Sequence, residues 1–96
     1  MRTDTIEAVG IDDRGSLWVK PTTATFPFIY REAMEVRWDA DRLRLYGPKP
    51  REWPYVAWFK QIRVAAREHG VELKLGPTTL WSGIDPDLQR AIASDD

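Results

Sequence analysis

The sequence predicts an α+β fold, with an antiparallel β-sheet of two hairpins plus a further strand, packed on one long helix, and a short C-terminal helix. Two observations predict this fold. The stretch 50–70 repeats apolar residues at helical spacing, and the segments on both sides of it alternate apolar and polar residues between Gly- and Pro-containing turns. With 96 residues, the chain is expected to form one domain over 1–96, with 92–96 frayed.

The helix is predicted from its ends and from one apolar face. Pro54 suits the first helical position, and Gly70 suits the left-handed residue that ends a helix. A step of about 100° per residue places seven side chains within an arc of about 120°. These inward residues are Tyr55, Trp58, Phe59, Ile62, Ala65, Ala66 and His69. We therefore expect the helix to supply much of the core.

Two hairpins are expected before the helix. The first joins strands 5–11 and 16–20 through the turn 12–15, and it leaves Trp18 as either a lid at the sheet margin or an exposed anchor. The second spans 34–46. To keep its apolar residues on one face, Trp38 should lie opposite Leu43, which places Arg37 opposite Arg44 on the outer face. Like charges across a ladder are unfavourable, so we expect a nearby carboxylate from Glu35, Asp39 or a partner chain.

Two further elements are expected after the helix. Residues 71–75 alternate and should form a strand that ends at Gly76-Pro77, and 78–81 favour one more short strand. Asp85 is the expected N-cap of the C-terminal helix, with Pro86 at its first position.

Composition excludes several classes of protein. The sequence has no cysteine, which excludes disulfides, thiolate metal sites and a cysteine nucleophile. The 14 basic and 15 acidic residues form no long block of one sign, so nucleic acid is not an expected partner. No apolar run reaches the ~20 residues of a membrane span, and no export signal is evident, so we expect a cytoplasmic protein.

No motif in the chain names a reaction. We find no Gly-rich phosphate loop, serine elbow or zinc-binding helix motif, and the aspartates fall as pairs in expected turns, where a solvated structural role is favoured over acid–base chemistry. His69, the only histidine, lacks sequence neighbours that would make a metal site or a catalytic dyad. We therefore predict no catalytic residues, metal or cofactor, and an enzyme remains an alternative only if distant residues converge.

The candidate binding residues are arginines and aromatic residues. Five tryptophans are several times the ordinary usage, and tryptophan either fills cores or anchors interfaces. Arg51, Glu52 and Trp53 precede the helix and, together with Tyr30, either line a pocket near residues 50–55 or serve as helix cap and staple. Trp18, Arg37 and Arg44 are candidates for a contact surface.

Two segments carry a resemblance to a known family. These are 26–39, above all its part Tyr30–Trp38, and 48–62, above all Pro50–Trp53. On these segments the chain resembles small α+β proteins encoded by integron gene cassettes, a family of unassigned function. The resemblance implies a compact protein that often self-associates, and it carries no catalytic residues over to this chain.

The leading functional hypothesis is a binding or assembly protein, a homo-oligomer and most simply a dimer, with a contact surface rich in tryptophan and arginine. One alternative is a small-molecule-binding protein with a cleft near the helix entry. Another is a protein that neutralises a partner protein, like an antitoxin or immunity protein.

Overall fold

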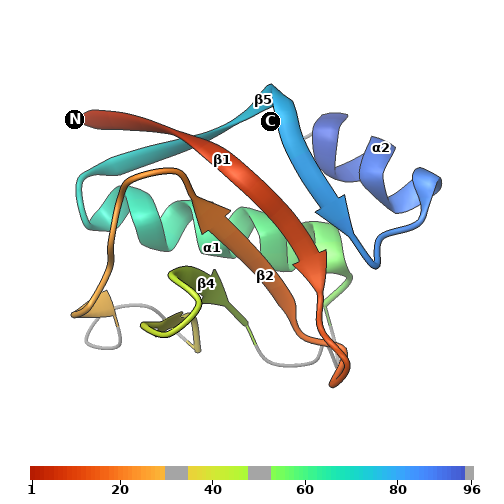
Figure 1. Cartoon of the computed structure of the whole chain (residues 1–96), viewed down its shortest axis with the longest axis horizontal. Coiled ribbons are helices and arrows are strands. Elements are labelled where there is room, and N and C mark those ends of the chain that lie inside the picture. The colour runs from red at the N-terminus through yellow and green to blue at the C-terminus, as the bar shows by residue number, and fades with distance from the viewer. Residues whose placement is uncertain (30–34, 48–52, 95–96) are drawn as a thin grey trace.

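The computed structural model describes residues 1–29, 35–47 and 53–94. The described elements form one sheet and two helices (Figure 1). In chain order they are β1 (Arg2–Ile11), β2 (Leu17–Pro21), β3 (Arg37–Asp39), β4 (Arg44–Tyr46), α1 (Tyr55–Glu68), β5 (Val71–Ser82) and α2 (Pro86–Ser94). An α+β fold with one long helix is therefore confirmed.

The sheet is mixed, which corrects the expectation of a wholly antiparallel sheet. Its strand order is β3-β4-β2-β1-β5, and β5 pairs parallel to β1 while the other three pairs are antiparallel. The cause is the long connection through α1. A helix between two strands returns the chain to the end at which the first strand began, so β5 runs parallel to β4. Because β4 and β1 are both antiparallel to β2, β5 also runs parallel to β1.

The predicted hairpin of β1 and β2 is present, with an irregularity in β1. The pairing steps from Ile6 opposite Pro21 to Ala8 opposite Lys20, so Glu7 is an extra residue. This bulge resets the alternation, which lets both Ile6 and Val9 point into the core. Ala8 and Gly10 consequently lie on the opposite face of the sheet.

The register of the second hairpin differs from the predicted one. Arg37 pairs with Tyr46, Trp38 with Leu45, and Asp39 with Arg44, so Arg37 and Arg44 are not opposite each other. The physical reason lies at Leu43, which has φ +55° and is 49% exposed, so it belongs to the turn and not to the apolar face of a strand.

The C-terminal third also differs from the prediction. One long strand, β5, replaces the two short strands expected over 71–81, and it keeps its pairing with β1 through an irregularity between Leu75 and Leu80. Residues 92–94, where fraying was expected, belong to α2, and Ile92 is fully buried. Asp85 caps α2 as predicted, since its Oδ1 accepts the Leu88 amide at 2.8 Å.

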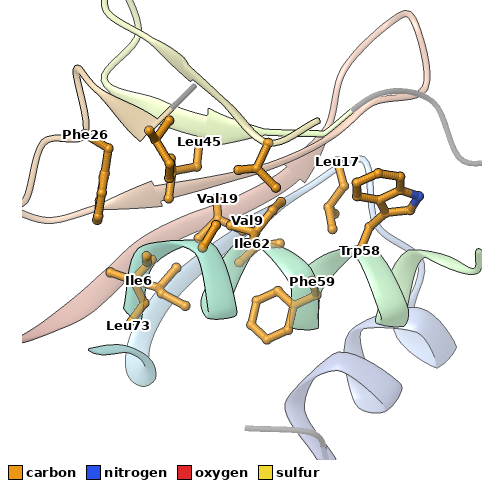
Figure 2. Close-up of a cluster of buried hydrophobic side chains, with 14 of the residues drawn as sticks. Ile6, Val9, Leu17, Val19, Phe26, Leu45, Trp58, Phe59, Ile62 and Leu73 are labelled. Atoms are coloured by element: carbon orange, nitrogen blue, oxygen red, sulfur yellow. The ribbon is translucent and has the colours of Figure 1, made fainter. Parts of the chain in front are cut away.

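The core lies between α1 and one face of the sheet. As predicted, Trp58, Phe59, Ile62, Ala65 and Ala66 are the buried residues of α1, and Gly70 has a positive φ. Figure 2 shows the helix side chains in one cluster with residues of β1, β2 and β4. Figure 1 shows α1 behind the strands, so the opposite face of the sheet is left uncovered by either helix.

Candidate functional site

Two of the candidate residues, Trp18 and Arg44, meet on the uncovered face of the sheet. Their neighbours in sequence, Leu17, Val19 and Leu45, point into the core, so Trp18 and Arg44 point the other way. The Arg44 Cζ atom lies 4.2 Å from the centre of the Trp18 ring, a cation–π contact. Trp18 is therefore a packed ring, only 9% exposed, and not an exposed anchor.

Gly10 lies directly beneath the Trp18 ring. It pairs with Trp18 across the β1–β2 ladder, and a Cβ atom built on Gly10 would fall 2.2 Å from the Trp18 Cζ2 atom. Only a residue without a side chain permits the ring to lie so close to the strand. Trp18 is therefore held between Gly10 beneath and the Arg44 guanidinium above.

The β1–β2 turn is ordered by a carboxylate. Asp12 Oδ1 accepts hydrogen bonds from the amides of Arg14 and Ser16, both at 2.9 Å, and Gly15 has φ +85°. The Tyr55 hydroxyl donates a 2.9 Å hydrogen bond to the Gly15 carbonyl. The first residue of α1 is thereby tied to this turn.

The β3–β4 turn uses the same device. Asp39 Oδ1 accepts hydrogen bonds from the amides of Asp41 and Arg42 at 3.0 Å, while its Oδ2 receives the Arg42 guanidinium at 3.3 Å. The hydrogen bond from the Arg42 amide is the main cause that lowers the Asp39 pKa, and it outweighs the opposite effect of burial. Asp39 is therefore ionised at neutral pH.

A polar cleft lies between these two turns. β4 connects them, because Tyr46 pairs with Trp18 just after the first turn and Arg44 pairs with Asp39 just before the second. The cleft has a volume of about 350 Å³. It is lined by residues of the first turn, the second turn and β4, namely Asp12, Asp13, Arg14, Asp39, Arg42, Arg44 and Tyr46.

Arg44 carries a charge that its surroundings only partly compensate. Burial lowers the pKa of Arg44 and so does the charge of Arg42, whereas the carboxylates of Asp39 and Asp12 raise it, with a net lowering. A guanidinium still remains protonated at neutral pH. Among the described residues, Arg44 makes a cation–π contact with Trp18, and no ion pair or hydrogen bond of its side chain is found.

The other candidates do not join this cleft. Arg37 is exposed on the edge strand β3, and it does not line the cleft. Trp53 is 45% exposed and packs its ring 5.1 Å from that of Trp58, centre to centre. Tyr30, Arg51 and Glu52, the other residues of the pocket expected near 50–55, lie outside the described residues.

Six residues that line the cleft were not among the candidate binding residues from the sequence: Asp12, Asp13, Arg14, Asp39, Arg42 and Tyr46. A signal for them exists, because each hairpin turn holds aspartates followed by an arginine, at 12–14 and at 39–42. What that signal lacks is the pairing of β4 with β2, which brings the two turns to one cleft.

His69 has a structural position. It caps the C-terminus of α1, where its amide donates a 3.0 Å hydrogen bond to the Ala66 carbonyl, and its ring lies 6.4 Å from that of Phe26. In the part of the chain that the structure describes, no group of three or more histidines or carboxylates could hold a metal ion. None of the helices over 1–29, 35–47 and 53–94 has the length and apolarity to cross a membrane.

Comparison with known proteins identifies the family. The model of the integron cassette protein Hfx_Cass5 family matches residues 4–79. The chain belongs to this family. A solved structure of Hfx_Cass5, from the mobile metagenome of the North West Arm sewage outfall, is 42% identical, with a TM-score of 0.51. The match covers 98% of this chain and 95% of that one, whereas no curated protein matches.

Proposed function

We propose that this member of the Hfx_Cass5 family is a binding protein that holds a small anion in the cleft between the two hairpin turns. The observation that carries the proposal is the placement of Arg44. Its guanidinium is half-buried, stacked on Trp18, and without an ion pair among the described residues, yet it lines a cleft.

The energetics of a half-buried guanidinium support an anionic ligand. Removing part of its hydration is unfavourable unless an acceptor replaces the water, and a planar guanidinium can give two parallel hydrogen bonds to a carboxylate or phosphate. Stacking on Trp18 fixes the plane of the guanidinium in advance, which reduces the entropy lost on binding. The cleft volume of about 350 Å³ lies at the small end of the range for ligand sites.

The direct test is calorimetric titration with sodium phosphate, acetate and succinate. We expect at least one of these anions to bind the native protein, and Arg44→Gln to weaken that anion at least tenfold. Arg90→Gln is the matched control, because Arg90 is an exposed arginine of α2 that pairs with Asp87. If none of the three anions binds at millimolar concentration, or if both variants weaken binding equally, the proposal is wrong.

Self-association is a second candidate, and exposed leucine on the uncovered face favours it. Leu80 of the edge strand β5 is 66% exposed and lies on the same face as Ala8, its partner in β1. The tryptophans favour self-association less, because Trp18 and Trp58 are almost fully buried and Trp53 is the only exposed one of the five. We therefore propose a dimer in which Leu80 and the sheet face around it form the contact between the two copies.

Light scattering coupled to size exclusion tests this second candidate. A dimer that Leu80→Lys converts to a monomer would support a contact through this face, with Leu43→Lys as the control at a turn away from β5. A native protein that stays monomeric as its concentration rises would refute the dimer. The antitoxin or immunity-like role and the cytoplasmic location stay predictions.

A further inference from the structure

The charges that line the cleft are balanced, with three arginines and three aspartates. They are not equally available to a ligand. Asp12 and Asp39 each use an oxygen to hold the amides of their own turn, and Arg42 pairs with Asp39 at 3.3 Å. These three residues are committed to the turns.

Other charged groups of the cleft have no such commitment. Asp13 and Arg14 are exposed, and within 1–29, 35–47 and 53–94 neither side chain makes a hydrogen bond or an ion pair. In the same ranges Arg44 stacks on Trp18 and makes no hydrogen bond or ion pair, although the charges of Asp39 and Asp12 are near enough to raise its pKa. The cleft thus offers a carboxylate at the first turn and a guanidinium on β4, in addition to the Arg14 guanidinium.

We infer that the ligand of the cleft is a small zwitterion, whose carboxylate binds Arg44 and whose ammonium group binds Asp13. This inference rests on the proposed binding of an anion at Arg44 and adds the class of molecule. A dianion such as phosphate would face three aspartates, and a simple cation would face three arginines. A molecule with both charges can pair with one group of each sign, and it carries no net charge that either set would repel.

The positions of the two groups indicate which zwitterions fit. Asp13 belongs to the β1–β2 turn, whereas Arg44 pairs with Asp39 beside the β3–β4 turn, so the two charges approach the cleft from different elements. We therefore expect an amino acid whose ammonium and carboxylate groups are separated by several carbon atoms to suit both groups. Linear ω-amino carboxylic acids are therefore the probes of choice.

The experiment compares matched pairs of ligands that differ only in the ammonium group. Native protein is titrated with 4-aminobutyrate and butyrate, and with 6-aminohexanoate and hexanoate, by calorimetry at low salt. We expect at least one amino acid to bind about tenfold or more tightly than the matched simple acid. Asp13→Asn should abolish that preference without weakening the simple acid, because it removes a negative charge from the cleft, whereas Arg44→Gln should weaken both ligands.

Two controls keep the result specific. Asp87→Asn removes a carboxylate of α2 whose side chain is 94% exposed, and it should leave the affinity for each of the four ligands unchanged. Because Arg44 packs on Trp18, the unfolding midpoint of Arg44→Gln is measured as well, and Arg44→Lys supplies a variant that keeps the positive charge. The Asp13 side chain is exposed and makes no hydrogen bond or ion pair among the described residues, so its variant is expected to fold as the native chain does.

The outcomes separate the inference from the proposal beneath it. Equal binding of both members of each pair, with loss in Arg44→Gln, would overturn the zwitterion and keep the anion site. No binding of any of the four ligands, together with no binding of phosphate, acetate or succinate, would overturn both. A preference for the amino acids that survives Asp13→Asn would overturn the role of Asp13.

Discussion

Replacing Gly10 by alanine tests how tightly the floor of the site is packed. Gly10 does not have a positive φ, so an alanine meets no backbone strain there, and the whole effect comes from the methyl group. That methyl would fall 2.2 Å, 2.4 Å and 2.8 Å from the Cζ2, Cε2 and Nε1 atoms of Trp18. All three distances lie far inside ordinary contact.

The magnitude follows from the displacement that the ring must make. Ordinary contact begins near 3.4 Å, so the ring has to retreat by about 1.2 Å from the strand. Its outer face is covered by Arg44, 4.2 Å from the ring centre, so the retreat displaces the guanidinium as well. Overpacking of this kind costs about 1–3 kcal/mol, and alanine regains about 0.5–1 kcal/mol over glycine in a strand. We expect a net loss of about 1–2 kcal/mol.

A double-mutant cycle in urea identifies the ring as the cause. Gly10→Ala should destabilise the native protein but stabilise the Trp18→Ala variant by about 0.5–1 kcal/mol, because the clash is gone and only the gain in strand propensity remains. The sign of the effect therefore reverses between the two backgrounds. If Gly10→Ala costs the same in both, the ring does not lie against Gly10 and the described packing of the site is wrong.

Three further predictions concern the fold around the site. Trp58→Ala should cost about 3–5 kcal/mol in a urea titration, since Trp58 is only 7% exposed, and an unmoved midpoint would place it outside the core. Thr79→Val should cost about 1–3 kcal/mol, because the Thr79 hydroxyl accepts from the Gly76 amide and donates to the Ile6 carbonyl; Thr78→Val at the exposed neighbour should cost far less. Burial raises the pKa of Asp4, but hydrogen bonds from the amides of residues 23 and 24 outweigh it, so the net pKa is lowered. The stabilisation by this carboxylate is present above its unfolded pKa of about 3.9 and is lost as the pH falls through the lower folded value. The free energy of unfolding, measured in urea, should therefore fall less on acidification in Asp4→Asn than in the native protein.

The elements governed by local pattern are the ones that the sequence predicts well. The inward face of α1, its end at Gly70 and the cap at Asp85 each depend on residues within a turn or two of each other. The first hairpin likewise follows from a short turn between two alternating segments. In these cases propensity, capping and hydrophobic periodicity point to one structure.

The parallel pairing of β5 could not be predicted in this way. Alternation at 71–75 shows that one face is buried, but it is the same for a parallel and an antiparallel strand. The direction is set by the path of α1 across the sheet, which is a property of the whole fold. The bulge at Glu7 shows a related limit, since one extra residue moves Val9 to the core face without any marker in the sequence.

The candidate site was only partly predictable, for a reason that the turns make clear. Trp18 and Arg44 were candidates because aromatic and arginine side chains are typical of binding surfaces. The aspartates of the turns predict solvated structural groups, and Asp12 and Asp39 do have that role, since each holds the amides of its turn. The same turns also line the cleft, so a structural role and a place in a site coexist in one residue.

The register of the β3–β4 hairpin determines the chemistry of the cleft. Leu45 is fully buried, so Arg44 must point to the uncovered face, and the left-handed Leu43 lies in the turn, so that Asp39 and not Arg37 stands opposite Arg44. Asp39 raises the pKa of Arg44 and also holds the turn that places it. A substitution at Asp39 would therefore change the electrostatics and the geometry together. Asp13 contributes a carboxylate without holding the turn among the described residues, which is why a change of binding in Asp13→Asn can be assigned to charge alone.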